Sequence, residues 1–291
     1  MWAIVQLFHA KCAVHQRLTY AACAVVAAHI VRSRSVEGMF DHVLIDEAQD
    51  FHAGHWRFLR AVAKKGPNDI FIAEDSHQRI YGQRLSLRNY GIETRGRAST
   101  KLRVNYRTTA QNLGYATSIL EGTEWIDSEE QTDSLTGYHS VRQGPAPVVL
   151  HSASKAEEAE ALAARMEEWI ASGEDISIGV LTRTNSRRAE IAAQLGDLGL
   201  AVSPDRQTTR QRSIAVMTMH NAKGLEFTHV VLLDVNAEAL PQRYLIQGLA
   251  QAEVDDTLQR ELALLYVAAS RARDVLVVSI VGEPSELLPV K

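Results

Sequence analysis

Two adjacent carboxylates directly follow an apolar run near the start of the chain. Asp46 and Glu47 come after the apolar residues 43–45, and Gln49 and Asp50 complete the sequence DEAQD. A short continuous apolar run is typical of a buried parallel strand, and ligands bind beyond the carboxyl ends of such strands. A carboxylate pair at that position can hold a magnesium ion and orient a water molecule. The pair therefore predicts phosphoryl-transfer chemistry and a phosphate-binding loop elsewhere in the chain.

Two further stretches in the first half carry groups suited to a nucleotide. Residues 71–81, FIAEDSHQRIY, read as a strand that ends in acids and is followed by Gln78, whose uncharged amide can sense a phosphate by hydrogen bonding. In residues 102–109, LRVNYRTT, Tyr106 offers a stacking face and Arg107 offers a fork of donors for phosphate. The first of these stretches alone also fits an ordinary polar loop.

Two stretches in the second half add an acid and two arginines. Residues 215–227, AVMTMHNAKGLEF, read as a strand that leads into a glycine-containing turn and Glu226. Residues 264–273, LLYVAASRAR, read as a helix that carries Arg271 and Arg273.

These five stretches, in this order, resemble the motifs of the UvrD/Rep type of superfamily 1 DNA helicases. DEAQD looks like the Walker B motif of the family, and EDSHQRIY looks like the GDxxQSIY motif that follows it. NYRT, TMHNAKGLEF and YVAASRA are similar to the later NYRS, TxHxxKGLEF and YVAxTRA motifs. The resemblance runs from about Asp41 to Leu276 and implies an ATP-dependent DNA helicase or translocase that moves 3′ to 5′ on single-stranded or partly duplex DNA.

The resemblance also assigns roles in binding and hydrolysing ATP. Asp46 would hold Mg²⁺, and Glu47 would orient and polarise the attacking water. Gln78 would contact the γ-phosphate and this water. The remaining nucleotide contacts would come from the second domain: Tyr106 stacked on adenine, Arg107 and Arg271 at the γ-phosphate, and Glu226 at the ribose or in coupling to DNA.

Contacts with DNA are implied for Thr218, His220 and Tyr81. Other interpretations remain open for single residues: His220 could be a buried structural histidine, Tyr106 could belong to the core, and Arg273 fits a solvated helix position. A segment of positive charge between Arg79 and Arg107 could add phosphate contacts, since only Glu93 opposes it.

Strand-like and helix-like segments alternate along the chain, which predicts an α/β fold with a parallel, doubly wound sheet in each half. With the resemblance, this indicates two RecA-like domains of the P-loop NTPase type: residues 1–96, incomplete, and residues 97–291. The predicted strands include residues 41–46, 69–75, 147–153, 176–184, 213–220, 228–235 and 274–282. The predicted helices include residues 55–66, 155–173, 186–199 and 260–273.

The phosphate loop that the acidic pair calls for, GxxxxGK[ST], is not found in the sequence. None of the seven lysines follows a glycine: Lys11, Lys64, Lys65, Lys101, Lys155, Lys223 and Lys291. We therefore expect the first domain to lack its N-terminal part, with the loop supplied by a missing segment or by a protein partner. A large accessory insertion of the longer helicases is also expected to be replaced by a short loop at residues 204–213.

Composition and net charge limit the binding partners and the cellular setting that the sequence predicts. The net charge is −4, from 31 lysines and arginines and 35 acids, so nucleic-acid binding would need a local patch. Cys12 and Cys23 match neither a disulfide framework nor a metal-site spacing, which predicts a reduced, cytoplasmic setting. The most apolar stretch, residues 21–31, is too short to span a bilayer, so no membrane contact is expected.

Two classes of function fit these observations. The first is the ATP-dependent helicase in a truncated form that is inactive alone, because it lacks the phosphate loop. The alternative is a non-catalytic helicase remnant that binds nucleic acid or a protein. The retention of Asp46, Glu47, Gln78, Arg107 and Arg271 favours the first class.

Overall fold

The computed structural model describes residues 2–34, 36, 38–82, 85–94, 98–172, 175–203 and 213–289. The chain forms two compact units. Unit 1 comprises Met1–Thr100 and Trp125–Asp133, and unit 2 comprises Lys101–Glu124 and Ser134–Lys291. The boundary at Thr100 lies inside the arginine-rich segment, and the return of Trp125–Asp133 to unit 1 is a feature that the predicted division at residue 96 does not contain. No helix in the described part of the chain is long and apolar enough to cross a membrane.

Unit 1 is built from helices that begin at side-chain caps and from short strands. Thr19 accepts a hydrogen bond from the Ala22 amide where α2 starts, and His52 accepts one from the Gly54 amide where α3 starts. Its elements are α1 (Trp2–Val14), α2 (Tyr20–Ser33), β1 (Val43–Ile45), the 3₁₀ helix η1 (Ala48–Asp50), α3 (Ala53–Val62), β2 (Ile70–Ile72), η2 (Ser76–Gln78), η3 (Leu87–Tyr90), β4 (Trp125–Ile126) and β5 (Thr132–Asp133).

Strands β1 and β2 form a two-stranded parallel sheet that buries only one face. Ile45 belongs to the core of unit 1, together with Trp56 of α3, and Val43, Ile70 and Ile72 pack against that core. The residues on the opposite face, Leu44 and Phe71, are paired in register and are 78% and 64% exposed. Because parallel sheets are normally covered on both faces, this sheet presents an open apolar face.

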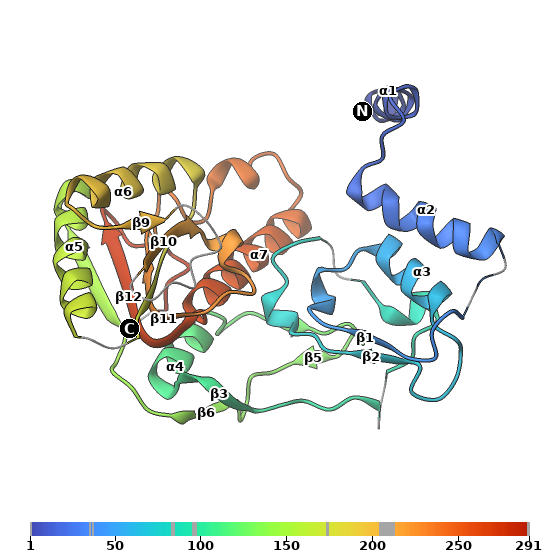
Figure 1. Cartoon of the computed structure of the whole chain (residues 1–291), viewed down its shortest axis with the longest axis horizontal. Helices are drawn as coiled ribbons and strands as arrows, with labels where there is room; N and C mark the ends of the chain where they lie inside the picture. Colours follow the sequence, from blue (N-terminus) through green and yellow to red (C-terminus); the bar gives the residue numbers. More distant parts are fainter. Residues whose placement is uncertain are drawn as a thin grey trace. The chain divides into compact units, whose positions relative to one another are not determined.

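Unit 2 contains a six-stranded parallel sheet with the strand order β7-β12-β11-β8-β10-β9 (Figure 1). Two further strands, β3 and β6, pair beside it. Its elements are β3 (Val104–Thr109), α4 (Ala110–Ser118), β6 (His139–Arg142), β7 (Val148–Ser152), α5 (Lys155–Ala171), β8 (Ser177–Thr182), α6 (Asn185–Asp197), β9 (Val202–Ser203), β10 (Ser213–Thr218), η5 (Met219–Ala222), β11 (Phe227–Leu232), η6 (Arg243–Leu245), α7 (Gln251–Ala269) and β12 (Ala272–Val281).

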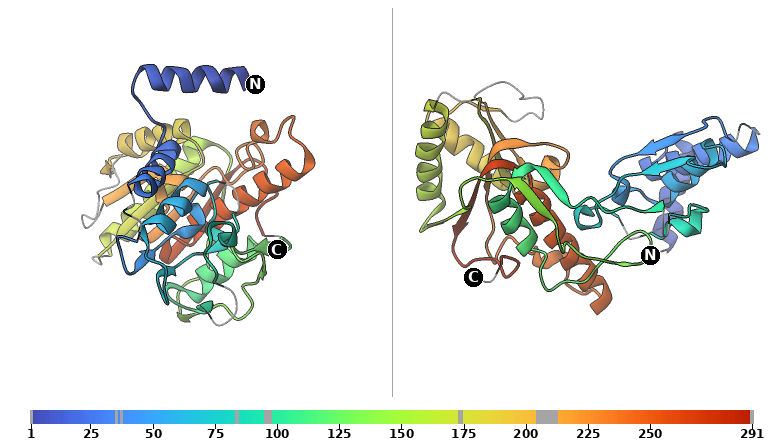
Figure 2. Two further views of the ribbon diagram at one scale, coloured as in Figure 1. Left: turned by 90° about the vertical axis from the view of Figure 1, so that its right-hand side faces the viewer. Right: turned by 90° about the horizontal axis from the view of Figure 1, so that it is seen from below.

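Helices cover both faces of the large sheet, as Figure 2 shows for unit 2. Helices α5 and α6 bury Leu162, Met166, Ile191 and Leu195 against strands β8, β10, β11 and β12. On the other face, α7 contacts β11 and β12, and its residues from Ala263 to Ala269 are all buried. Since neither face is solvated, the strands read as continuous apolar runs rather than as alternating patterns.

The close approach of two strands in this sheet requires a glycine. A Cβ atom at Gly179 of β8 would lie 2.6 Å from the ring of Phe227, which begins β11. The ring therefore occupies the space that a side chain would need.

The prediction of a parallel α/β fold is confirmed, and each predicted strand and helix is present with shifted ends. α3 ends at Val62 because Ala63 is extended, and α7 begins at Gln251, earlier than predicted. In the described part of unit 1, however, the parallel sheet has two strands rather than a doubly wound set. The predicted short loop falls almost entirely on residues 204–212, which lie outside the described residues.

A buried ion pair joins the two helices on one face of the large sheet. The Arg187 guanidinium on α6 donates to the Glu158 carboxylate on α5, and their side chains are 4% and 3% exposed. Ser279 of β12 also donates to Glu158, at 2.6 Å, and Asp234 lies 3.4 Å from the Arg187 Nε. Each charge is thus paired where it cannot reach bulk water.

We expect Arg187→Ala to lower the free energy of unfolding by about 3–5 kcal/mol, because the Glu158 carboxylate would stay buried without its partner. Urea titration followed by circular dichroism measures the change. Arg188→Ala, one position further along α6, is the matched control and should change stability by less than about 0.5 kcal/mol. A loss below about 1 kcal/mol for Arg187→Ala would show that the pair contributes little to folding.

Candidate functional site

The acidic pair occupies a constrained turn directly after β1. Asp46 is exposed, and its Oδ1 accepts a hydrogen bond from the Glu47 amide at 2.9 Å. Glu47 has a φ of 53°, in the left-handed region, and η1 begins immediately after it. A non-glycine residue in that conformation costs of order 1–3 kcal/mol and is found most often at functional sites. The backbone therefore fixes the direction of the Glu47 side chain at the end of the strand.

A chain of hydrogen bonds links Glu47 to Gln78. The Gln49 amide nitrogen donates to Glu47 Oε2 at 2.6 Å, and the Asp75 backbone amide donates to Gln49 Oε1 at 3.1 Å. The Gln78 amide nitrogen then donates to Asp75 Oδ2 at 2.8 Å. Because β1 and β2 are parallel neighbours, their carboxyl ends meet, and the two predicted catalytic groups share one network. The sequence showed Gln49 and Asp75 beside these groups but did not reveal their bridging role.

The geometry at Asp46 fits a magnesium ligand. The described residues contain no cluster of three or more His, Cys, Asp or Glu side chains that could hold a metal ion. Magnesium needs no such cluster, because one or two carboxylates bind it together with waters and substrate phosphates. An exposed carboxylate at the end of β1 meets that requirement.

The predicted nucleotide residues of unit 2 gather at the amino-terminal edge of the large sheet. Glu226 directly precedes β11 and Arg271 directly precedes β12, and the Phe227 amide donates to the Arg271 carbonyl at 3.1 Å. The Arg107 Nε lies 2.6 Å from Glu226 Oε1 in an ion pair that is open to solvent. Tyr106 is 73% exposed, so it does not belong to the core.

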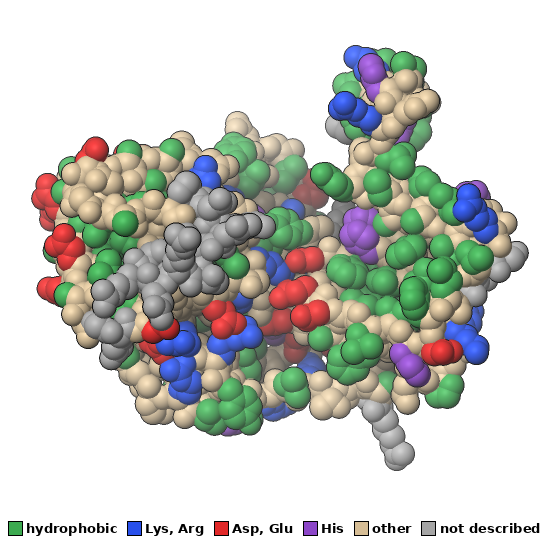
Figure 3. Space-filling model, viewed as in Figure 1, with side chains coloured by type: hydrophobic (Ala, Val, Ile, Leu, Met, Phe, Trp, Pro, Cys, Tyr) green, Lys and Arg blue, Asp and Glu red, His purple; other side chains and the backbone are tan. Residues whose placement is uncertain are grey.

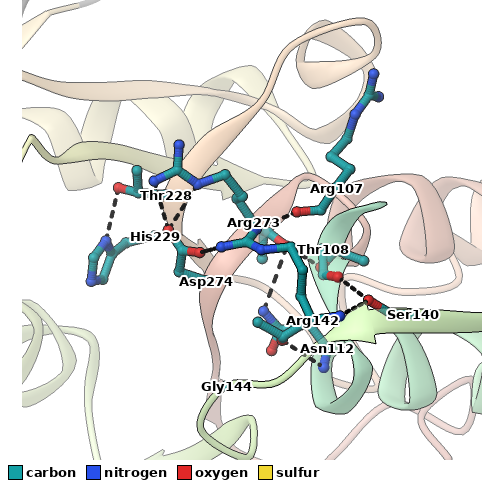
Figure 4. Close-up of polar contacts among 12 residues, drawn as sticks. Arg107, Thr108, Asn112, Ser140, Arg142, Gly144, Thr228, His229, Arg273 and Asp274 are labelled. Atoms are coloured by element: carbon teal, nitrogen blue, oxygen red, sulfur yellow. Dashed lines mark hydrogen bonds and ion pairs between the residues drawn. The ribbon is translucent and has the colours of Figure 1, made fainter. Parts of the chain in front are cut away.

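The backbone of Arg107 is anchored by hydrogen bonds around β3, which Figure 4 shows. Arg142 of β6 donates to the Arg107 carbonyl and binds Asp274 Oδ1 at 2.6 Å (Figure 4). The buried Thr108 hydroxyl donates to the Ala272 carbonyl, which joins the residue after Arg107 to the residue after Arg271. Arg142 and Thr108 therefore fix β3 to β12, a role that the sequence did not indicate.

The Arg271 side chain is buried, unlike that of an arginine whose guanidinium extends into solvent. Arg271 is 6% exposed, and within unit 2 its guanidinium donates to the carbonyls of Val267, at 3.0 Å, and Leu225, at 3.3 Å. Asp274 and Glu261, two acids near Arg271 in the sequence, bind other arginines. Arg271 thus braces the turn that carries Glu226 in addition to any role at a phosphate.

The predicted DNA residues of unit 2 lie at the opposite edge of the same sheet. Thr218 ends β10, and its hydroxyl accepts a hydrogen bond from the Asn221 amide, which caps η5. His220 follows in η5 and is partly buried. Because all six strands are parallel, the carboxyl end of β10 and the amino end of β11 lie at different edges. The sheet therefore separates the two groups of motifs.

A buried ion pair determines the electrostatic environment of His220. Arg183 binds Glu261 through two hydrogen bonds, of 2.6 and 3.1 Å, and both side chains are less than a tenth exposed. Loss of hydration lowers the pKa of His220, the Arg183 charge lowers it further, and Glu261 acts in the opposite direction. The folded protein therefore favours the neutral imidazole.

The other predicted DNA contacts lie in unit 1 and at the boundary. Tyr81 follows η2 and is 44% exposed. Arg79, by contrast, is buried and donates to the Gly82 carbonyl at 3.0 Å, so it supports its own loop. Arg88 and Arg103 are exposed. Three further arginines of this segment lie outside the described residues: Arg84, Arg95 and Arg97.

The parallel-sheet units and the motifs at their edges define a RecA-like α/β protein. Residues 4–90 match the family model of the UvrD/REP helicase N-terminal domain, and residues 197–283 match that of the UvrD-like helicase C-terminal domain. The chain belongs to the UvrD/REP-like helicase family.

Curated relatives include three bacterial helicases. The chain is 27% identical to DNA helicase II of Haemophilus influenzae over 167 residues, 54% of this chain and 21% of the relative. It is 33% identical to the ATP-dependent DNA helicase PcrA of Staphylococcus aureus over 101 residues, 33% of this chain and 13% of the relative. A protein described as a probable DNA helicase in Mycoplasma pneumoniae is 25% identical over 247 residues, 81% of this chain and 42% of the relative. The matches thus span less than half the length of these relatives.

Among solved structures, the C-terminal domain of a possible DNA helicase from Lactobacillus plantarum is similar to this chain. Its TM-score is 0.47 at 21% identity, and the match covers 64% of this chain and 94% of that one.

The pKa of His220 predicts a pH dependence of stability. In the unfolded chain a histidine titrates near pH 6.5, whereas the folded protein resists protonation of His220. The stability that neutral His220 contributes is present above about pH 6.5 and is lost as the pH falls, because the unfolded state then binds the additional proton. Between pH 8 and pH 5.5, the melting temperature of the wild type should therefore fall more than that of His220→Gln. His151→Gln, at an exposed position, is the control, and equal falls in wild type and His220→Gln would contradict the interpretation.

Proposed function

We propose that this chain is part of an ATP-dependent DNA helicase or translocase that moves 3′ to 5′ along single-stranded or partly duplex DNA. The observation that carries the proposal is the hydrogen-bonded path Glu47–Gln49–Asp75–Gln78, which unites two predicted catalytic groups at the ends of neighbouring strands. A cytoplasmic location is part of the proposal.

Each group in unit 1 has a task in ATP hydrolysis. Asp46 is proposed to bind Mg²⁺, which when present neutralises charge on the β- and γ-phosphates. Glu47 orients and polarises the attacking water, and its fixed backbone keeps the carboxylate at the strand end. Gln78 contacts the γ-phosphate with the amide group whose nitrogen Asp75 holds.

Unit 2 supplies the remaining nucleotide contacts. Tyr106 is proposed to stack on adenine, and Glu226 to contact the ribose. Arg107 and Arg271 are proposed to reach the γ-phosphate, where arginines of this kind contribute about 10³- to 10⁵-fold in rate. The Arg107–Glu226 ion pair is exposed and therefore weak, so phosphate can compete with Glu226 for the guanidinium.

The opposite edge of the sheet in unit 2 is proposed to contact DNA through Thr218 and His220, and Tyr81 of unit 1 adds a further contact. A neutral imidazole and a hydroxyl can both donate hydrogen bonds to phosphate oxygens. The separation of the two edges allows nucleotide and DNA to bind unit 2 at the same time.

The phosphate-binding loop is proposed to come from a further segment or a protein partner. The open face of the β1–β2 sheet supports this proposal, because Leu44 and Phe71 leave apolar area that a helix would cover. In Figure 3, hydrophobic side chains gather over unit 1 on the face shown. A strand beside β1 or β2 would also place its carboxyl end next to Asp46 or Asp75.

A second candidate function is a non-catalytic module that binds nucleic acid or a protein. The observation in its favour is the lack of a GxxxxGK[ST] sequence in these 291 residues. Measurements on the isolated chain separate the two candidates.

The isolated chain should hydrolyse ATP negligibly, because backbone amides and a lysine of the phosphate loop supply much of the binding of the β- and γ-phosphates. Release of phosphate from purified protein, with and without single-stranded DNA, measures the rate. The Glu47→Gln variant controls for contaminating activity. A turnover of order 1 to 10³ per second that Glu47→Gln abolishes would show that the chain needs no added loop.

Binding of single-stranded DNA should weaken with salt, by a slope of about −0.7 in log K against log salt for each phosphate neutralised. Fluorescence anisotropy at several salt concentrations gives the slope. Arg88→Ala should make the slope shallower by about 0.7 if this exposed side chain contacts a phosphate. Lys155→Ala, whose amine binds Glu190 on the neighbouring helix, is the control and should leave the slope unchanged. A slope near zero in the wild type would instead favour a protein-binding role.

A further inference from the structure

The hairpin Trp125–Asp133 belongs to unit 1, although the segments before and after it in the sequence belong to unit 2. Strands β4 and β5 pair through Trp125 and Asp133, and Asp127 closes the turn by accepting hydrogen bonds from the amides of Glu129 and Gln131, both at 2.9 Å. The hairpin is therefore a small ordered element rather than a loose connection.

The hairpin contacts three residues on either side of Asp75: Glu74, Ser76 and His77. The Ser76 hydroxyl donates to Asp133 Oδ2. The His77 ring lies 5.2 Å from the Trp125 ring, and both side chains are at most 5% exposed. At the turn of the hairpin, the Ser128 hydroxyl donates to Glu74 Oε1 at 2.5 Å.

These positions flank the residue that holds Gln78. Asp75 Oδ1 accepts from the His77 amide at 3.0 Å, and Asp75 Oδ2 accepts from the Gln78 side chain at 2.8 Å. A shift of Ser76 or His77 would move Asp75 and, with it, the Gln78 amide. The hairpin therefore supports Gln78 through the residues around Asp75.

The contacts to Ser76 and His77 are made by the two ends of the hairpin. Trp125 is the first residue after the chain leaves unit 2, and Asp133 is the last before the chain returns to it.

We propose that the hairpin Trp125–Asp133 positions Gln78. Asp133 and Trp125 are positioning residues in this proposal. The importance of Gln78 rests on the proposed ATP hydrolysis, but the mechanical link from the hairpin to the turn does not.

Hydrogen exchange of the full chain, read by mass spectrometry on peptides covering residues 73–80, tests the link. Asp133→Ala removes the acceptor of the Ser76 hydroxyl, and the amides of Asp75, His77 and Gln78 should exchange about tenfold faster, the change expected for loss of a hydrogen bond to a charged group. Asp133→Asn keeps an acceptor oxygen and should restore slow exchange. Gln131→Ala, at an exposed position of the same hairpin, is the matched control. Peptides from β8 and β11 should be unchanged in all variants.

Unchanged exchange of residues 73–80 in Asp133→Ala would overturn the proposal, as would equal loosening in Asp133→Asn. If Asp133→Ala fails to fold, Ser76→Ala removes the other partner of the same bond and must give the local loosening. No nucleotide or DNA is present in this experiment. Failure of the link would therefore leave the proposed helicase function standing, and failure of ATP or DNA binding would leave this result standing.

Discussion

The pairing of β1 with β2 is the constraint on which the candidate catalytic site depends. Their parallel register brings the ends of two apolar strands together, so that Gln49 can bridge Glu47 and the backbone of Asp75. Each bond in this path is ordinary, but a network of polar groups at a strand end is rigid only when all of its members are satisfied. The left-handed backbone of Glu47 adds a local cost that the surrounding turn must offset.

In the proposed function, the large sheet of unit 2 serves two ligands. Strands that all run in the same direction have an amino-terminal edge and a carboxyl-terminal edge with different loops. Glu226 and Arg271 lie at the first edge, and Thr218 and His220 lie at the second. The buried pair Arg187–Glu158 joins α6 to α5, and the buried pair Arg183–Glu261 joins the end of β8 to α7. In the proposed function, this rigid sheet transmits conformational changes between the nucleotide-binding edge and the DNA-binding edge.

Much of this arrangement could be predicted from the sequence, because it depends on local patterns. The apolar run before Asp46 predicts β1, and the run around residues 228–235 predicts β11. The supports of the site could not be predicted in this way, since they join residues that are distant in sequence. Arg142 reaches both Arg107 and Asp274, and Asp133 reaches Ser76, through contacts that no spacing rule indicates. The burial of Arg271 was also missed, because a charged residue near a helix end usually faces solvent.

In the proposed function, Glu47 acts on the attacking water and does not merely shape the turn. The most direct test is a comparison of wild type and Glu47→Gln in a form of the protein that includes a phosphate-binding loop. Single-turnover hydrolysis gives the rate of the chemical step, and a fluorescent ATP analogue gives the Kd. We expect the rate of the chemical step to fall at least about a hundredfold in Glu47→Gln, as for loss of a general base, while the Kd stays nearly constant. A loss of nucleotide binding as large as the loss of rate would contradict it and would show that Glu47 is structural.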